Sequence, residues 1–204
     1  MKALKNQFKT ILFLLIVGAI SVGCSSDDDI GDNGGEPSIN EGNASAVINV
    51  DNQIIEFSSE TDNSFATITQ FEIEGNEIDK LTIIMADDNS GLMIAVEVAP
   101  APNSPMNYDL SNVGFGQDYM LTATVLLDGE NSSETDIYGV GSYSQDGELT
   151  QSQGLFKITS ITNTTIKGTF NMTLYNSYSP NDDFNTKELT VTEGEFELPI
   201  VDIN

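Results

Sequence analysis

The sequence contains no histidine, no tryptophan and no arginine, and it has a single cysteine. Without histidine, the usual general base of Ser-His-Asp and Cys-His catalysis is missing, so those hydrolase mechanisms are excluded. Zinc and copper sites normally draw on histidine or cysteine, and no glycine-rich phosphate loop stands between a strand pattern and a helix pattern. We therefore expect neither a transition-metal enzyme nor a nucleotide-dependent one, and we predict a protein that is not an enzyme.

The single cysteine, Cys24, follows an export signal. Three lysines precede an apolar run over residues 10–20, which is about half the length of a transmembrane helix. Ser21-Val22-Gly23-Cys24 then resembles a lipobox, with Ser21 in the place usually taken by leucine. We predict that residues 1–23 are a lipoprotein signal peptide and that Cys24 is lipidated, so that its acyl chains anchor the protein in the cell outer membrane. The alternative is an ordinary signal peptide with an incidental thiol.

Basic residues are scarce beyond the signal. From Cys24 onward, four lysines stand against 32 carboxylates, a formal charge of −28. Such a surface repels phosphate backbones and anionic lipid headgroups, so we expect no nucleic-acid partner. Basic proteins and divalent cations remain compatible with it.

Residues 24–43 are rich in Ser, Asp, Gly and Asn and nearly free of large apolar groups, which predicts a flexible, disordered tether. Its fully extended reach is about 60 Å, enough to hold a domain clear of the headgroups. The run Asp27-Asp28-Asp29 resembles the surface-export signals of Bacteroidota lipoproteins. We expect the lipoprotein export machinery to place the domain on the cell surface; the alternative is that the run is only a soluble spacer.

From Ala44 to Asn204 the apolar pattern has period two, which predicts one all-β domain. Along residues 165–175, the even-numbered positions are apolar or glycine and the odd-numbered positions are mostly polar, as in a half-buried antiparallel strand. About ten such runs are separated by turn signals such as Asp51-Asn52. We predict a single antiparallel β-sandwich or barrel-like domain of about ten strands. The prolines between residues 100 and 105 predict a rigid crossover loop.

The last strand changes face. Leu189 and Val191 are odd-numbered, whereas Phe196, Leu198 and Ile200 are even-numbered. One extra residue would bring both sets to the same side of the sheet, so we predict a β-bulge at or beside Gly194.

The C-terminal half contains three short strand motifs, Gly154-Leu155-Phe156-Lys157-Ile158-Thr159, Gly168-Thr169-Phe170 and Val191-Thr192-Glu193-Gly194-Glu195-Phe196. Through these motifs it resembles an uncharacterised family of Bacteroidota lipoproteins. Glu193 replaces the asparagine that the family carries before this glycine, and Asn49-Val50-Asp51-Asn52 lacks the glycine of an earlier family motif. The resemblance implies a β-sandwich-like lipoprotein and supplies no catalytic residues.

Calcium is the cofactor for which the sequence offers ligands, because it takes six to eight oxygen donors. The candidate ligands are Asp128, Glu130, Glu134 and Asp136, then Asp182 and Asp183 after Asn181, and the turn Asp87-Asp88-Asn89. None of these clusters has EF-hand spacing, and the alternative is that they are solvated turns.

Three functions remain open. The first is a surface-displayed binding module for a protein or glycan partner. The second is a lipocalin-like carrier, in which small inward residues such as Ala123, Gly139 and Gly141 leave room for a ligand. The third is a carboxylate-dependent enzyme acting on glycans, with Tyr175 and Tyr178 as surface platforms and with Tyr119 and Tyr143 in the core.

Overall fold

The computed structural model describes residues 42–59, 63–73, 76–87, 90–112, 118–127, 136–140, 142–143, 149–150, 152–178 and 188–202. All of them belong to one compact unit, residues 39–204. Within these ranges the chain forms antiparallel strands and one short 3₁₀ turn, η1 (Leu110–Asn112), and no α-helix. The all-β prediction is confirmed. The predicted signal peptide, Cys24 and nearly all of the tether lie outside the described residues.

The strands follow the sequence patterns closely. They are β1 (Asn43–Val50), β2 (Gln53–Ser59), β3 (Phe65–Ile73), β4 (Asn76–Asp87), β5 (Leu92–Ala99), β6 (Met106–Asp109), β7 (Met120–Leu127), β8 (Asp136–Gly139), β9 (Ser142–Tyr143), β10 (Leu149–Thr150), β11 (Gln153–Ile161), β12 (Thr165–Tyr178) and β13 (Glu188–Pro199). The predicted loop after Ala99 is present, but β6 follows it directly, and this four-residue strand is too short to predict beside Pro105.

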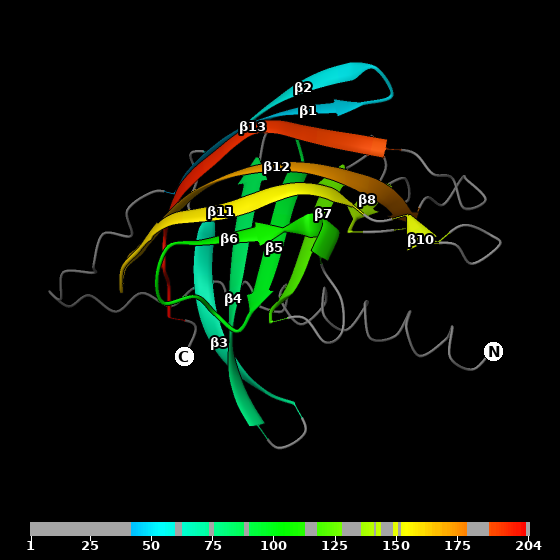
Figure 1. The fold of residues 1–204 in the computed structure, drawn as a ribbon. Coiled ribbons are helices and arrows are strands. Elements are labelled where there is room, and N and C mark those ends of the chain that lie inside the picture. Colours follow the sequence, from blue (N-terminus) through cyan, green and yellow to red (C-terminus); the bar gives the residue numbers. More distant parts are fainter. Residues whose placement is uncertain are drawn as a thin grey trace, which may run out of the picture. The chain divides into compact units, whose positions relative to one another are not determined.

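One curled sheet contains all of these strands except the β9–β10 pair, and it forms a half-barrel in the order β2-β1-β13-β12-β8-β7-β5-β4-β3 (Figure 1). β12 joins two parts of this sheet. Along one edge it pairs first with β11, which pairs onward with β6, and then with β8 near its end. We call β6, β11, β12, β13, β1 and β2 the β12 half, and β3, β4, β5, β7 and β8 the β5 half.

The segment after β13 reaches the far edge of the half-barrel. Ile200 forms a parallel bridge with Ala66 of β3, and the Val201 amide donates a hydrogen bond of 2.8 Å to the Ala66 carbonyl. The fold is thus a half-barrel in which the segment after β13 bridges to the edge strand β3, while β2 forms the other edge.

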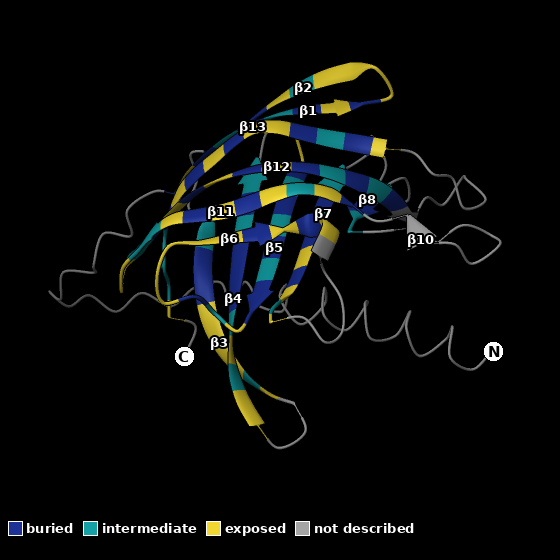
Figure 2. Ribbon diagram, viewed as in Figure 1, coloured by how far each residue is buried: buried dark blue, intermediate teal, exposed yellow. Residues whose placement is uncertain are grey.

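The two halves fill the interior with different side chains. The β5 half contributes mainly aliphatic groups, including Ile83, Ile94 and Val125, and one buried aromatic residue, Tyr138. The β12 half contributes an aromatic cluster. Its centre is Phe156, whose ring stacks on Phe196 with centroids 5.5 Å apart and planes 9° apart. Figure 2 shows the buried positions as bands along both halves.

Two glycines make room for these rings. Gly168 pairs across β12 and β13 with Phe196, and Gly194 pairs with Phe170. A Cβ atom on Gly168 would lie 2.2 Å from the Lys157 carbonyl oxygen and 2.4 Å from the Phe196 ring, and one on Gly194 would lie 2.5 Å from the Phe170 ring. The Gly-x-Phe motifs of the two strands are therefore one reciprocal structure, in which each ring lies over the other strand's glycine.

The predicted β-bulge is confirmed. Phe170 pairs with Gly194, but Met172 pairs with Val191, so two residues of β13 oppose one of β12. Glu193 has a φ of 53°, in the left-handed region. The predicted hairpin turn at residues 51–52 also has positive φ angles, of 50° and 63°.

Candidate functional site

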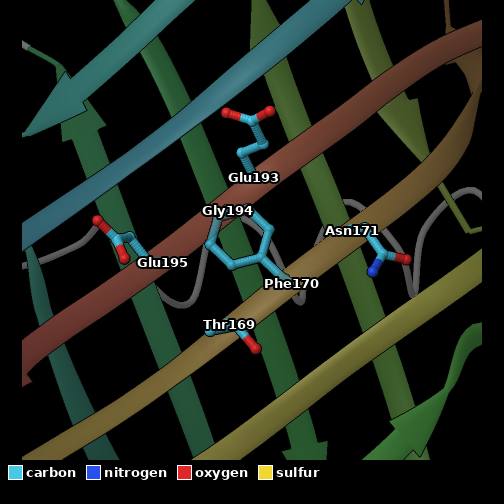
Figure 3. A pocket seen from close by; sticks show the side chains of 6 residues that line it. All are labelled: Thr169, Phe170, Asn171, Glu193, Gly194 and Glu195. Carbon is cyan, nitrogen blue, oxygen red and sulfur yellow. The ribbon is translucent and has the colours of Figure 1, made fainter.

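The bulge in β13 shapes the outer face of the β12 half. Outward side chains on this face are mostly polar and exposed, and they include Thr169, Asn171, Glu195 and Glu197. Between β12 and β13 the bulge leaves an open hollow of about 340 Å³. Figure 3 shows the residues that line it, which are Thr169, Phe170, Asn171, Glu193, Gly194 and Glu195.

Two glutamates flank Gly194 and give this hollow its acidic character. Both side chains are exposed, and the Ser45 hydroxyl donates a hydrogen bond of 3.4 Å to Glu195 Oε1. On the opposite side, the Asn171 side chain is turned to β11, because its Oδ1 accepts the Leu155 amide at 3.2 Å. The hollow thus presents carboxylates to solvent, which suits a cationic group. The bulge prediction could have located it, since both glutamates adjoin Gly194.

A lysine neutralises the next carboxylate along β13. Lys167 Nζ lies 2.7 Å from Glu197 Oε1, and the two side chains are 47% and 58% exposed. At this exposure the pair is solvated, so its contribution to stability is small.

Two tyrosines, Tyr108 and Tyr119, lie next to the aromatic cluster of the β12 half, where Tyr108 contacts Phe156. Their rings form an edge-to-face contact with centroids 5.0 Å apart. The Tyr119 hydroxyl accepts the Asp109 amide at 3.0 Å and donates to the Asp109 carbonyl at 3.2 Å. The buried Tyr108 hydroxyl has no hydrogen-bond partner among the described residues, and burial, with a smaller contribution from Tyr119, raises its pKa to about 12. A hydroxyl held neutral in this way cannot serve as a general base at ordinary pH.

The Asp109 carboxylate caps the turn that follows β6. It accepts the Ser111 hydroxyl at 2.6 Å and the Ser111 amide at 2.9 Å. These hydrogen bonds lower the pKa of Asp109 because they favour its charged form. We assign this carboxylate a structural role in the turn.

Of the calcium candidates on the β7–β8 connection, only Asp136 is described. It is half-buried at the start of β8, where the Asn176 side-chain amide donates to its Oδ1 at 3.5 Å. Asp128, Glu130, Glu134, Asn181, Asp182 and Asp183 lie outside the described residues, so calcium binding there stays a prediction. No group of three or more Asp or Glu side chains that could hold a metal occurs in the described part of the chain.

The remaining calcium candidate, Asp87, belongs to a turn. Its Oδ2 accepts the Ser90 hydroxyl at 2.7 Å, and its carbonyl accepts the Gly91 amide at 3.0 Å. Asp88 and Asn89 are outside the described residues.

The residues named for a carrier or a glycan site fall in different places. Ala123 faces inward and is buried, but Gly139 pairs with Thr124 and Tyr175 and faces outward, which corrects the expectation that it lines the interior. Tyr119 packs partly buried against the core, as predicted, and Tyr175 is half-buried on the outer face. Gly141 and the side chains of Tyr143 and Tyr178 are not described.

No protein-family model matches the chain, and no curated protein or solved structure matches it either. None of the helical turns in the described ranges is long and apolar enough to cross a membrane.

Proposed function

We propose that this protein is a lipid-anchored, surface-displayed binding module that pairs with an extended segment of a partner protein along β2. The observation that carries the proposal is the edge position of β2. Its inner edge pairs with β1 over seven residues, and no described strand pairs with its other edge. Such an edge presents a row of free amides and carbonyls, which is the structure that strand-adding partners recognise.

The sequence of β2 protects this edge with only one charged residue, Glu56. Proteins usually guard an edge strand with lysine, proline or a bulge, and none of these occurs in Gln53-Ile54-Ile55-Glu56-Phe57-Ser58-Ser59. Ile54 is 71% exposed. The β1–β2 hairpin also forms one margin of the half-barrel, where a partner has access to it (Figure 1).

The charges beside β2 suggest the chemistry of the partner. Glu56 faces outward opposite Val47, which pairs in turn with Thr192, one residue before Glu193. An added strand would therefore lie on an acidic surface. We propose a partner segment that combines apolar residues, to cover Ile54, with lysine or arginine.

A filled interior makes the carrier function the weaker alternative. The largest inward side chains of both halves, among them Tyr138, Phe156 and Met85, are at most 1% exposed. A carrier for small apolar ligands needs a cavity of about 300 Å³ or more. The hollow at the bulge has that volume, but it is open and acidic.

The anchor completes the proposal. Lipidation of Cys24 would hold the domain in the outer membrane, and the acidic tether would present it at the cell surface. Two observations test this part: labelling with palmitate that Cys24→Ser abolishes, and loss of the domain on protease treatment of intact cells while a periplasmic control survives. Protection from the protease would contradict surface display.

Photocrosslinking in intact cells tests the binding site. A benzoylphenylalanine residue replaces Ile54 of β2 in one full-length variant and Leu155 of β11, which is 37% exposed, in the control. We expect a discrete protein adduct from position 54 and none from position 155. Equal adducts at both positions, or none at either, would contradict strand addition at β2.

A further inference from the structure

The outer face of the β5 half carries two apolar rows that the proposed function does not use. Each row is formed by residues that face each other across strands. Phe65, Ile84 and Ala95 belong to one row, and Ala86, Met93 and Leu126 belong to the next. All six are partly buried. They alternate along their strands with fully buried residues such as Ile83 and Ile94, so both faces of this half are apolar.

The pattern differs sharply from that of the β12 half. In β5 no residue is exposed, and its burial alternates between buried and intermediate. In β11 and β13 most outward residues are exposed and polar. Sheets that are apolar on both faces are normally covered on both faces. Yet the described strands all belong to the curled sheet itself or to the β9–β10 pair, and none packs on this outer side.

This outer face is also electrically neutral. In the row beyond the two apolar ones, Glu97 faces Thr82 and Thr122. Lys80 Nζ lies 2.7 Å from Glu97 Oε1, with both side chains about one-fifth exposed. The threonine hydroxyls lie 3.5 Å from the same carboxylate. The one carboxylate of these three rows is thus matched by a cation.

We propose that a second copy of this chain covers this face, so that two β5 halves pack outer face to outer face about a two-fold axis. A two-fold contact brings the same patch together from both copies, and sheets pack face to face at about 10 Å. Because the mature chain has a formal charge of −28, two copies repel over most of their surfaces. The neutral apolar face is where they meet without opposing carboxylates.

The size of the face suits a weak dimer. Four strands spaced by about 4.8 Å, each contributing about seven residues at about 3.4 Å, cover about 520 Å² together with the four residues of β8. Two such faces would bury about 1,000 Å² in total, which is about the lower limit for a specific interface. Association should therefore depend on concentration.

A lipid bilayer is the other apolar surface that this face could contact. The residues of the face favour a second copy of the chain over a bilayer. The face has no tryptophan or tyrosine in its apolar rows, and its one lysine is already paired with Glu97. Membrane-binding surfaces usually combine apolar residues with unpaired Lys or Arg that attract anionic lipids.

Cysteine crosslinking of the full-length chain in its own cells tests the proposal, because Cys24 is the one native cysteine. Thr124→Cys places a thiol on the apolar face, and Thr173→Cys places one on the outer face of the β12 half. Both threonines are half-buried and outward-facing on inner strands of the sheet, so they form a matched pair. The unmodified chain controls for reaction at Cys24.

With a bismaleimide that spans about 10 Å, we expect at least about tenfold more covalent dimer from Thr124→Cys than from Thr173→Cys. Adding Met93→Asp to the Thr124→Cys chain should remove most of that dimer, whereas adding Thr190→Asp should not. Equal yields from both cysteines would overturn the proposal. So would a cysteine at position 124 that is shielded from a soluble maleimide without forming a dimer, because lipid or another protein would then cover the face. Unchanged protease resistance verifies that each variant folds.

Discussion

The two halves of the curled sheet differ in the side chains that they bury inside and in those that they present outside. The β12 half packs aromatic rings over glycines inside and presents threonine, asparagine and glutamate outside. The β5 half packs mainly aliphatic side chains inside, together with Tyr138, and leaves further apolar side chains partly buried outside. The difference teaches that the outer face of the β12 half is suited to contact with water, whereas the apolar outer face of the β5 half is suited to contact with a second copy of the chain.

The largest effect should come from the reciprocal glycine-phenylalanine structure of the β12 half. We expect Gly168→Ala to lower the free energy of unfolding by about 3 kcal/mol, because the new methyl group would meet the Lys157 carbonyl and the Phe196 ring. Urea denaturation measures the loss. Thr169→Ala, at the neighbouring exposed position, is the control and should change stability by less than about 0.5 kcal/mol. Similar values for the two variants would show that the rings adjust and that the glycine is not required.

The second-largest difference in stability should come from the ion pairs of the two halves. Lys80→Met leaves the half-buried Glu97 without its cation and should destabilise the fold by about 1.5 kcal/mol. Lys167→Met breaks the pair with Glu197, which has the same 2.7 Å distance but is about half exposed, and should have an effect below about 0.5 kcal/mol. Thermal unfolding at moderate salt compares them. Equal losses would mean that the outer face of the β5 half is as well solvated as that of the β12 half.

The two tyrosines in edge-to-face contact, Tyr108 of β6 and Tyr119 just before β7, should change stability in opposite directions. Tyr108→Phe removes a buried hydroxyl without a partner and should stabilise the fold by about 1 kcal/mol, while Tyr119→Phe removes two hydrogen bonds to Asp109 and should destabilise it by about 1 kcal/mol. Chemical denaturation measures both. Destabilisation by Tyr108→Phe would indicate that its hydroxyl has a bonded partner, such as an ordered water.

The raised pKa of Tyr108 leads us to expect that stability changes with pH in the alkaline range. In the unfolded chain Tyr108 should lose its proton near pH 10, but in the fold it keeps the proton up to about pH 12 because its pKa is raised. The unfolded state therefore binds fewer protons in this range, and stability falls as pH rises from about 10 to 12. Tyr108→Phe should reduce that slope relative to the unmodified chain; an unchanged slope would assign it to other groups.

The smallest expected effect is at the bulge. Glu193 has positive φ, which asparagine tolerates better than glutamate does. Glu193→Asn should raise the free energy of unfolding by about 0.5 kcal/mol. Glu195→Asn, also exposed but without positive φ, should leave it nearly unchanged. An equal gain from both would mean that relief of charge repulsion, rather than backbone strain, is responsible.

Much of this fold follows from residue order alone. Period two locates most of the strands, and the change of face between Val191 and Phe196 locates the bulge, because side-chain direction in a strand is fixed by parity. The reciprocal pairing of Gly168 with Phe196 could not be predicted in this way, since it depends on the register between β12 and β13. The branch of β12 toward β8 depends likewise on curvature, which the local pattern does not encode.

The apolar outer face of the β5 half could not be predicted from the sequence for a similar reason. The alternation of Leu92, Ile94 and Val96 predicts the buried side of a strand, and the intervening Met93 and Ala95 face outward. Continuous apolar runs indicate a strand buried on both sides, but the sequence does not say which neighbour covers the second side. The acidic hollow needs the bulge and the flanking glutamates together, and only the bulge was predicted.

The position of β13 between β1 and β12 affects how the chain acquires its structure during synthesis. β1 is the first strand of the domain and β13 the last, yet they are neighbours along most of their length. Until residues 188–199 are made, the β1–β2 hairpin has no third strand, and an isolated hairpin is only marginally stable in water. Contacts between such distant parts of a chain also form slowly. The β1–β2 hairpin of the nascent chain should thus gain its stable place in the sheet only after the last strand has been made, which makes it the last part of the described fold to form.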